Sequence, residues 1–512
     1  MTGRTAPASP EPPPPPADRG AERGDAPREG DRPDEGAGGG GGRPDEGAGG
    51  EGGRPDEGTA REGRRLDEGA RREGRRQALA RLGLLAASCV AAPGCSPFEM
   101  RPASRRVSGG RGGRADLALA GATVFAAPGV PPFANAIVVI ERGRVVAVGE
   151  RDRTPLDAER VINVRGAFVT AGLWNCHVHF TGPEWAGAAK RPAAELDGAM
   201  RAMLTRRGFT SVIDLGSDPE GTLPLRERVR RGEVRGPAIL SAGPSFFPPA
   251  GRPFYLRPPS ERPGAPPPEL RTPAEAEAAV RECARLGTDV VKIFTGSPVG
   301  DRKVAHMPEE VVRAVCAEAR RQGKPVFAHP QDAEGLRRAV AGGVDVVAHT
   351  APAAGPLPPA LLAEMRRAGT AVVPTLTLWH RGLVQEGEAE AFALEWQGRG
   401  VEQLRGLVAA GVEVLFGTDV GYLRHDDTAD ELGLMAGAGM GFDRLLEALT
   451  AGPARRFGRP GRSGRVAPGY DADLVVLADD PRQDPRAFAA PRLSLRSGRV
   501  LYDAAGRAEK GR

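Results

Sequence analysis

Short apolar runs alternate with amphipathic stretches of helical period through most of the chain after residue 115. The apolar runs have the length of buried strands, and Gly, Pro or polar residues bound most of them. Eight strands are predicted, at residues 167–180, 211–215, 238–242, 290–294, 326–329, 344–349, 371–378 and 414–417. Helices are predicted between most of them, at residues 193–207, 273–286, 308–322, 334–341 and 359–367. Eight strand–helix units over about 280 residues predict an α/β fold with a closed parallel (β/α)8 barrel, the TIM barrel.

Further β-strands are predicted on both sides of this region. They lie at residues 117–124, 136–141 and 144–148 before the barrel, and at residues 474–477, 493–496 and 499–502 after it. Each group is too small to bury a core alone, so the two groups are predicted to pair. We therefore expect a small β-sandwich built from residues 115–170 and 455–505, beside a barrel of residues 171–452.

Residues 1–112 have a different composition, dominated by Pro, Gly, Arg, Asp and Glu, with little apolar content. An Arg-Pro-Asp-Glu-Gly motif recurs in them with a period of eleven residues. Without an apolar stripe, such a repeat predicts a disordered low-complexity tail. The alternative is that the natural start lies further downstream.

One segment of this tail resembles a bacterial lipoprotein signal. A basic stretch at residues 71–76 precedes an apolar run at residues 78–92, and small residues then lead to Cys95. The run is too short to span a bilayer with assurance. Lipidation of Cys95 or Cys89 would give a cell-envelope lipoprotein, with membrane contact only through that anchor. If the segment is ordinary tail, a cytoplasmic location is the alternative.

The net charge of +5 does not point to nucleic acid, because the Arg residues are dispersed among acidic ones. No basic and aromatic platform for nucleic acid is evident in the sequence. Three cysteines lie in the predicted folded part: Cys176, Cys283 and Cys316. Their spacing suits neither a zinc site nor a disulfide framework, so we expect reduced thiols in the core.

The candidate chemistry lies where the predicted strands end. His177 and His179 end the first strand, and because side chains alternate along a strand, their imidazoles point to the same side. His329 and His349 end the fifth and sixth strands, so four of the seven histidines fall on one rim. The carboxyl ends of barrel strands carry catalytic residues, and imidazoles gathered there are suited to bind a divalent metal.

Two more residues stand at this rim, Lys292 in the fourth strand and Asp419 after the eighth. Together with the histidines, they resemble the site of the amidohydrolase superfamily of metal-dependent hydrolases. The resemblance covers about residues 115–505. Residues 334–345 and 469–474 contribute to it, and the former are most similar to the branch with imidazolonepropionase-like and Xaa-Pro dipeptidase-like members.

The resemblance implies a binuclear centre of two divalent ions, expected to be Zn²⁺. Its ligands would be His177, His179 and Asp419 for the first ion, His329 and His349 for the second, and carboxylated Lys292 bridging both. CO2 would therefore be needed to modify Lys292. Asp419 would also be catalytic, as general base and then general acid. The alternative is a mononuclear site in which Lys292 binds substrate or lies at the rim.

These expectations describe a hydrolase that cleaves a C–N bond of a small molecule, in an amide, cyclic amide or dipeptide. The alternatives are a lactonase, an esterase, a phosphotriester hydrolase, a mononuclear deaminase or imidazolonepropionase-like hydrolase, and an inert binding protein. Residues 244–271, rich in Pro and aromatic residues, are a candidate lid. Tyr255 in this loop and His380 after the seventh strand are candidate substrate-binding residues. The sequence is compatible with a homo-oligomer.

Two positions depart from the pattern of that family. Asn175 stands where members commonly have Asp, which leaves the orientation of the neighbouring ligands less certain. Pro330 and Gln331 follow His329, where relatives often have a second His. Substrate recognition is therefore expected to differ from these relatives more than metal binding does.

Overall fold

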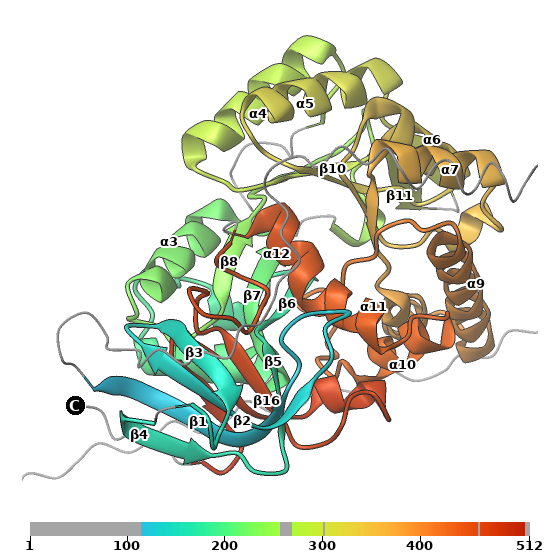
Figure 1. Cartoon of the computed structure of the whole chain (residues 1–512). Helices are drawn as coiled ribbons and strands as arrows, with labels where there is room; N and C mark the ends of the chain where they lie inside the picture. The colour runs from blue at the N-terminus through green and yellow to red at the C-terminus, as the bar shows by residue number, and fades with distance from the viewer. Residues whose placement is uncertain (1–113, 155, 257–268, 301–302, 459–460, 507–512) are drawn as a thin grey trace, which may run out of the picture. The chain divides into compact units, whose positions relative to one another are not determined.

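The computed structural model describes residues 114–154, 156–256, 269–300, 303–458 and 461–506 (Figure 1). The chain divides into two units, Met1–Glu99 and Met100–Arg512, and every described residue belongs to the second. The predictions for the tail, including lipidation of Cys89 or Cys95, lie outside the described residues. Within these ranges, no helix is both long and apolar enough to cross a membrane.

The strands predicted at both ends of the chain pair in one eight-stranded sheet. Its order is β18-β17-β16-β5-β1-β2-β3, with β4 beside β1. The strands are β1 Ala115–Val124, β2 Phe133–Glu141, β3 Arg144–Glu150, β4 Ala158–Asn163, β5 Phe168–Ala171, β16 Leu474–Leu477, β17 Pro491–Arg496 and β18 Arg499–Asp503. The antiparallel pairing of β5 with β16 joins the early and late segments. Apolar residues of both segments, such as Val138, Val169 and Leu474, share one buried cluster.

A second set of strands is parallel throughout and follows the order of the sequence. One sheet contains β6 Leu173–Val178, β7 Phe209–Asp214 and β8 Ala238–Ser241. The other contains β9 Ser245–Phe246, β10 Val291–Phe294, β13 Val326–His329, β14 Val346–Ala348 and β15 Ala371–Val373. Figure 1 labels β6, β7, β8 and β10 of these sheets and several of the helices that connect the strands, as expected for an α/β fold.

The eighth predicted barrel strand does not form a regular ladder. Val414 makes an isolated bridge to Val372, and Val420 makes another to Val178. Single backbone hydrogen bonds nevertheless hold this segment between β15 and β6: Leu415 donates to Val372 O and Cys176 donates to Phe416 O, both at 2.8 Å. The chain leaves the extended conformation soon afterwards, because Asp419 has a φ of 63°. The predicted eight-stranded ring is thus observed as two sheets with single bonds at this junction.

The predicted helices lie within a few residues of their expected places. They are α2 Ala193–Met203, α4 Pro273–Leu286, α5 Glu309–Arg321, α6 Ala333–Gly342 and α7 Pro359–Ala368. The side chains of Thr272 and Asp332 accept hydrogen bonds from backbone N–H groups at the starts of α4 and α6. Such capping explains why these helices begin where the sequence indicates. Longer connections near the C-terminus contain α9 Glu390–Ala409 and α10 Ala429–Gly437.

Two predicted strands are shorter or divided in the structure. Residues 167–180 form β5 and β6, which belong to different sheets, and Gly172 separates them. A Cβ atom on Gly172 would lie 2.1 Å from Thr210 Oγ1, so only glycine fits at this crossing. The strand predicted at residues 371–378 ends at Val373, because Thr375 turns the chain with a φ of 43°.

Candidate functional site

Three side chains converge at the end of β6. His177 lies on β6, His179 follows it, and Asp419 reaches them from the segment after Val414. Asp419 Oδ1 lies 3.0 Å from His179 Nε2 and 3.4 Å from His177 Nε2. Backbone bonds fix this approach, since Asp419 N donates to His177 O and His179 N donates to Val420 O. The ligand atoms of the three residues all lie within 4.8 Å of one another.

The chemistry of this group fits a divalent cation. It offers two imidazole nitrogens and one carboxylate oxygen, which are ordinary ligands of zinc-like ions. Asp419 Oδ1 is buried and has no hydrogen-bond partner among the described residues. A buried oxygen in this state is costly unless something else compensates it, and a cation would do so.

Two further imidazoles extend the group across the rim. The ring of His349 lies 4.6 Å from that of His177 and 4.7 Å from that of His329, centroid to centroid. Burial, followed by nearby positive groups, holds the pKa of His177 and of His349 well below the ordinary value. Burial, with the charge of Lys292, lowers the pKa of His329 to about 4. These rings are therefore neutral near pH 7, the form in which imidazole binds a metal.

Lys292 of β10 lines the same cavity as the four histidines. Its side chain is only 2% exposed, and burial lowers the pKa of its amine to about 8, with Asp419 opposing that shift. The charge of Lys292 is among the causes that lower the pKa of His177, His329 and His349, which line the same cavity. As an unmodified amine, Lys292 adds a positive charge to this site and no anionic ligand.

Asn175 of β6 ties the first strand to the loop of Asp419. Its Oδ1 accepts from the backbone N–H groups of His177, at 3.1 Å, and Thr418, at 3.2 Å. Its Nδ2 donates to Thr418 Oγ1 at 2.7 Å. Asp at this position could accept the same two backbone bonds, so the departure from the family pattern preserves the connection between the ligands.

The Asn175→Ala variant is expected to be markedly less stable because two buried N–H groups would lose their acceptor. The loss in free energy of unfolding should be about 2–6 kcal/mol, from about 1–3 kcal/mol for each of the two groups. Denaturant unfolding of the metal-stripped protein measures it. Asn175→Asp, which keeps an oxygen acceptor, is the matched control and should retain most of the stability. An unchanged unfolding midpoint for the Ala variant would show that these bonds do not stabilise the site.

Unusual backbone conformations gather around the same cluster. Eight non-glycine residues among those described have positive φ angles, and four of them belong to this region. These four are Gln331, His349, Thr375 and Asp419. Each such conformation costs about 1–3 kcal/mol and tends to persist where function requires it. Sequence reasoning missed Gln331 and Thr375 as neighbours of the histidines, because nothing in the local sequence indicates a positive φ at these positions.

Both missed residues contact imidazole nitrogens directly. Gln331 Oε1 lies 2.9 Å from His329 Nε2, and Thr375 Oγ1 lies 2.6 Å from His349 Nδ1. Asp214 of β7, the other buried acid near His179, instead bonds Ser217 and Ser241. Burial raises the pKa of Asp214, with the charge of His179 opposing the shift.

All six predicted metal ligands line one cavity of about 750 Å³. They are His177, His179, Lys292, His329, His349 and Asp419. Aromatic side chains form much of the remaining wall, including Trp379, Trp396, Phe392, Tyr422 and the predicted Tyr255. The Tyr255 and Tyr422 rings lie 5.2 Å apart. Within the candidate lid, the described residues Phe254, Tyr255 and Leu256 all line this cavity.

His380, the other candidate for substrate binding, does not line the cavity. Its Nε2 lies 2.6 Å from Glu390 Oε1 on α9. His306 pairs with Asp332 at 2.9 Å, away from the four clustered imidazoles. The three cysteines are buried free thiols, as predicted.

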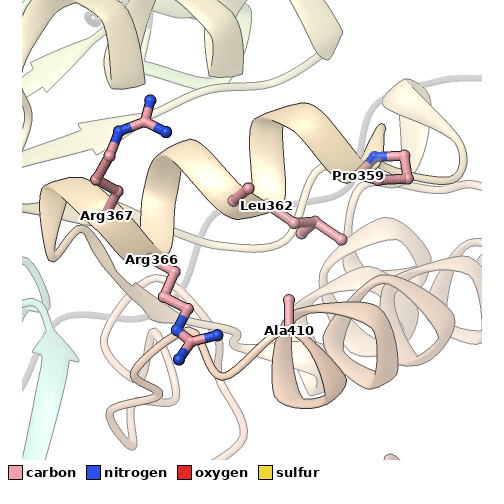
Figure 2. A pocket seen from close by; sticks show the side chains of 6 residues that line it. Pro359, Leu362, Arg366, Arg367 and Ala410 are labelled. Atoms are coloured by element: carbon pink, nitrogen blue, oxygen red, sulfur yellow. The ribbon is translucent and has the colours of Figure 1, made fainter. Parts of the chain in front are cut away.

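A second hollow, of about 460 Å³, lies between α7 and the end of α9 (Figure 2). Figure 2 shows Pro359, Leu362, Arg366 and Arg367 of α7, with Ala410 at the end of α9. None of the predicted ligands reaches it, so the cavity at the strand ends is the candidate site.

Comparisons with known proteins agree with this geometry. The sequence pattern described as "Amidohydrolase family" matches residues 168–500. An uncharacterised protein of Mycobacterium tuberculosis is 29% identical over 349 residues, which cover 66% of this chain and 86% of that protein. Ochratoxinase of Aspergillus niger is 26% identical over 398 residues, which cover 70% of this chain and 80% of that enzyme.

A solved structure of a candidate prolidase from Bifidobacterium longum is also similar. Its TM-score is 0.64 at 28% sequence identity, and the match covers 76% of this chain and 95% of that one.

Proposed function

Because the chain belongs to the amidohydrolase family, as its sequence predicted, we propose that it hydrolyses a C–N bond in a small amide, cyclic amide or dipeptide. The observation that carries this proposal is the convergence of His177, His179 and Asp419 in the lining of one large cavity. The similarity to a candidate prolidase and to ochratoxinase supports an amide-type substrate. The aromatic wall of the cavity supports an apolar group beside the bond that is cleaved.

We propose that the cluster holds two divalent metal ions, with Zn²⁺ as the expected ion. The first would be held by His177, His179 and Asp419, and the second by His329 and His349. Carboxylation of the buried Lys292 amine by CO2 would supply the anion that the second pair of histidines lacks. When bound, such ions polarise a carbonyl group and lower the pKa of a water molecule.

The chain's own residues then carry the proton. Asp419 lines the cavity and its Oδ1 has no hydrogen-bond partner among the described residues, so it can accept a proton from the attacking water. The water oxygen forms a bond to the carbonyl carbon, and the C–N bond breaks. Asp419 returns the proton to the leaving nitrogen, so the products are a carboxylic acid and an amine.

We also propose that the two parallel sheets belong to one closed barrel. Asp289 N donates to Ser241 O at 2.8 Å between β8 and the start of β10, and the bonds of Leu415 and Cys176 bridge the other junction. These single bonds support the proposal that the two sheets and residues 414–417 are sectors of one ring of the eight predicted strands, in which β8 and the short β9 together take the third place. Such a ring would bring all six site residues to one rim.

A mononuclear hydrolase, of the deaminase or imidazolonepropionase-like kind, is the second candidate. His177, His179 and Asp419 form the only group of three His, Cys, Asp or Glu ligands found within the described residues. In that case, Lys292 would remain an amine and contact the substrate. Its modification state therefore separates the two candidates.

Removing the metal is expected to abolish hydrolysis of an amide substrate. The test compares chelator-treated protein, before and after addition of zinc and bicarbonate, on matched dipeptides, aryl amides, lactones and phosphotriesters. We expect activity to fall at least about 100-fold and to return on reconstitution, with amides or dipeptides as the best substrates. Full activity after complete chelation would contradict a metal-dependent mechanism. Preference for lactones or phosphotriesters would replace the amide assignment.

A further inference from the structure

Thr375 contacts a candidate ligand from outside the cavity. Its Oγ1 lies 2.6 Å from His349 Nδ1, and its side chain is fully buried. In the tautomer that leaves Nε2 free for a metal, the Nδ1–H group donates to this hydroxyl oxygen. The bond therefore selects both the orientation of the ring and the nitrogen that faces the cavity.

The backbone at Thr375 is strained, so something must hold it there. Its φ of 43° is unfavourable for a β-branched residue and costs about 1–3 kcal/mol. Without compensation, the turn would relax toward the extended conformation of β15, and the hydroxyl would leave His349.

Glu431 of α10 supplies that compensation. Its Oε1 accepts from Leu376 N at 2.8 Å, and its Oε2 accepts from Thr377 N and Thr377 Oγ1, both at 2.7 Å. Its side chain is fully buried, and no ion pair to it is found in the described part of the chain. Burying a carboxylate without a cation is costly. All three hydrogen bonds come from Leu376 and Thr377, the two residues after Thr375. This pattern indicates that the Glu431 carboxylate holds the turn at Thr375 in place.

We propose that Glu431 and Thr375 are positioning residues that fix the His349 imidazole for metal binding. Glu431 holds the turn at residues 376–377, the turn holds Thr375, and the Thr375 hydroxyl holds His349. The inference rests on the proposed metal-dependent function. It adds the hydrogen bonds by which Glu431 and Thr375 would orient His349, a proposed ligand of the second ion.

Metal affinity of the full chain tests this proposal without relying on activity. Thr375→Val removes the hydroxyl but keeps the shape of the side chain, whereas Thr375→Ser keeps a hydroxyl. Glu431→Gln replaces one acceptor oxygen of the carboxylate by an NH2 group. The control is Thr288→Val, which loses a buried hydroxyl that donates to Cys283 O and does not line the cavity. Zinc is titrated against a chromogenic chelator, and thermal unfolding is recorded in parallel.

The second zinc ion is expected to bind about 10- to 100-fold more weakly in Thr375→Val and in Glu431→Gln. Thr375→Ser and Thr288→Val should bind both ions as the wild-type chain does. The proposal is overturned if Thr375→Val keeps wild-type affinity, or if Thr375→Ser loses as much affinity as the Val variant. A wild-type chain that binds no zinc would instead overturn the proposed function, and this inference with it.

Discussion

Asp419→Asn is expected to remove most of the turnover while leaving the metal ions largely bound. Asparagine keeps the size of the side chain and one oxygen ligand, so the group with His177 and His179 can persist. It cannot accept the proton of the attacking water or return it to the leaving nitrogen. Loss of a general acid–base group lowers kcat by about 100- to 10,000-fold.

The measurement is kcat on the best amide of the substrate panel, together with metal content of the same sample. Asp426→Asn is the matched control, because Asp426 lies in the same loop but pairs with Arg206 and does not line the cavity. It should keep wild-type kcat. A kcat near that of the wild type for Asp419→Asn would show that the proton is carried by another group.

Lys292→Ala is expected to lower activity by at least about 100-fold, because the second pair of histidines would lose its anionic partner. Lys303→Ala provides the control, since Lys303 lines the same cavity and is exposed. It should leave the response to bicarbonate unchanged. A carbon-13 carbamate signal should appear in wild-type protein reconstituted with labelled bicarbonate and be absent from Lys292→Ala.

Two results would count against a carboxylated lysine. The first is activity in Lys292→Ala that matches the control variant. The second is reconstitution of the wild-type protein to full activity in buffer freed of CO2. Either result would favour the mononuclear candidate, in which the Lys292 amine contacts the substrate.

The candidate ligands were predictable because they follow simple periodicities. The alternation of side chains along β6 places His177 near the position of His179, and parallel strands bring His329 and His349 to the same edge. Helices such as α4 were equally predictable, because Thr272 caps it and Gly287 ends it in the left-handed conformation.

What the sequence did not reveal depends on contacts between distant segments. The division of residues 167–180 at Gly172 depends on the approach of Thr210, about forty positions later. The positive φ at Thr375 is imposed by tertiary bonds from Glu431, and a threonine in an apolar run otherwise predicts a strand. His380 was expected near the cavity from its place after a strand, but it lies in a π-helix, Leu378–Gly382, and its ring contacts Glu390 instead.

The strain around the site also has a physical meaning. His349 and Asp419, two of the proposed ligands, have φ angles of 79° and 63°. Buried hydrogen bonds support both positions. Thr375 bonds the His349 ring directly, and Asn175 bonds Thr418, the residue before Asp419. Holding these ligands in strained conformations therefore lowers the stability of the fold, as is common at functional sites.

The number of metal ions per chain tests the central claim most directly. The full chain and its Lys292→Ala variant are expressed with added zinc and bicarbonate, and their metal content is measured by elemental analysis. The account predicts two ions in the wild-type chain and fewer in the variant. One ion in both proteins, or none, would contradict the binuclear centre proposed for these residues.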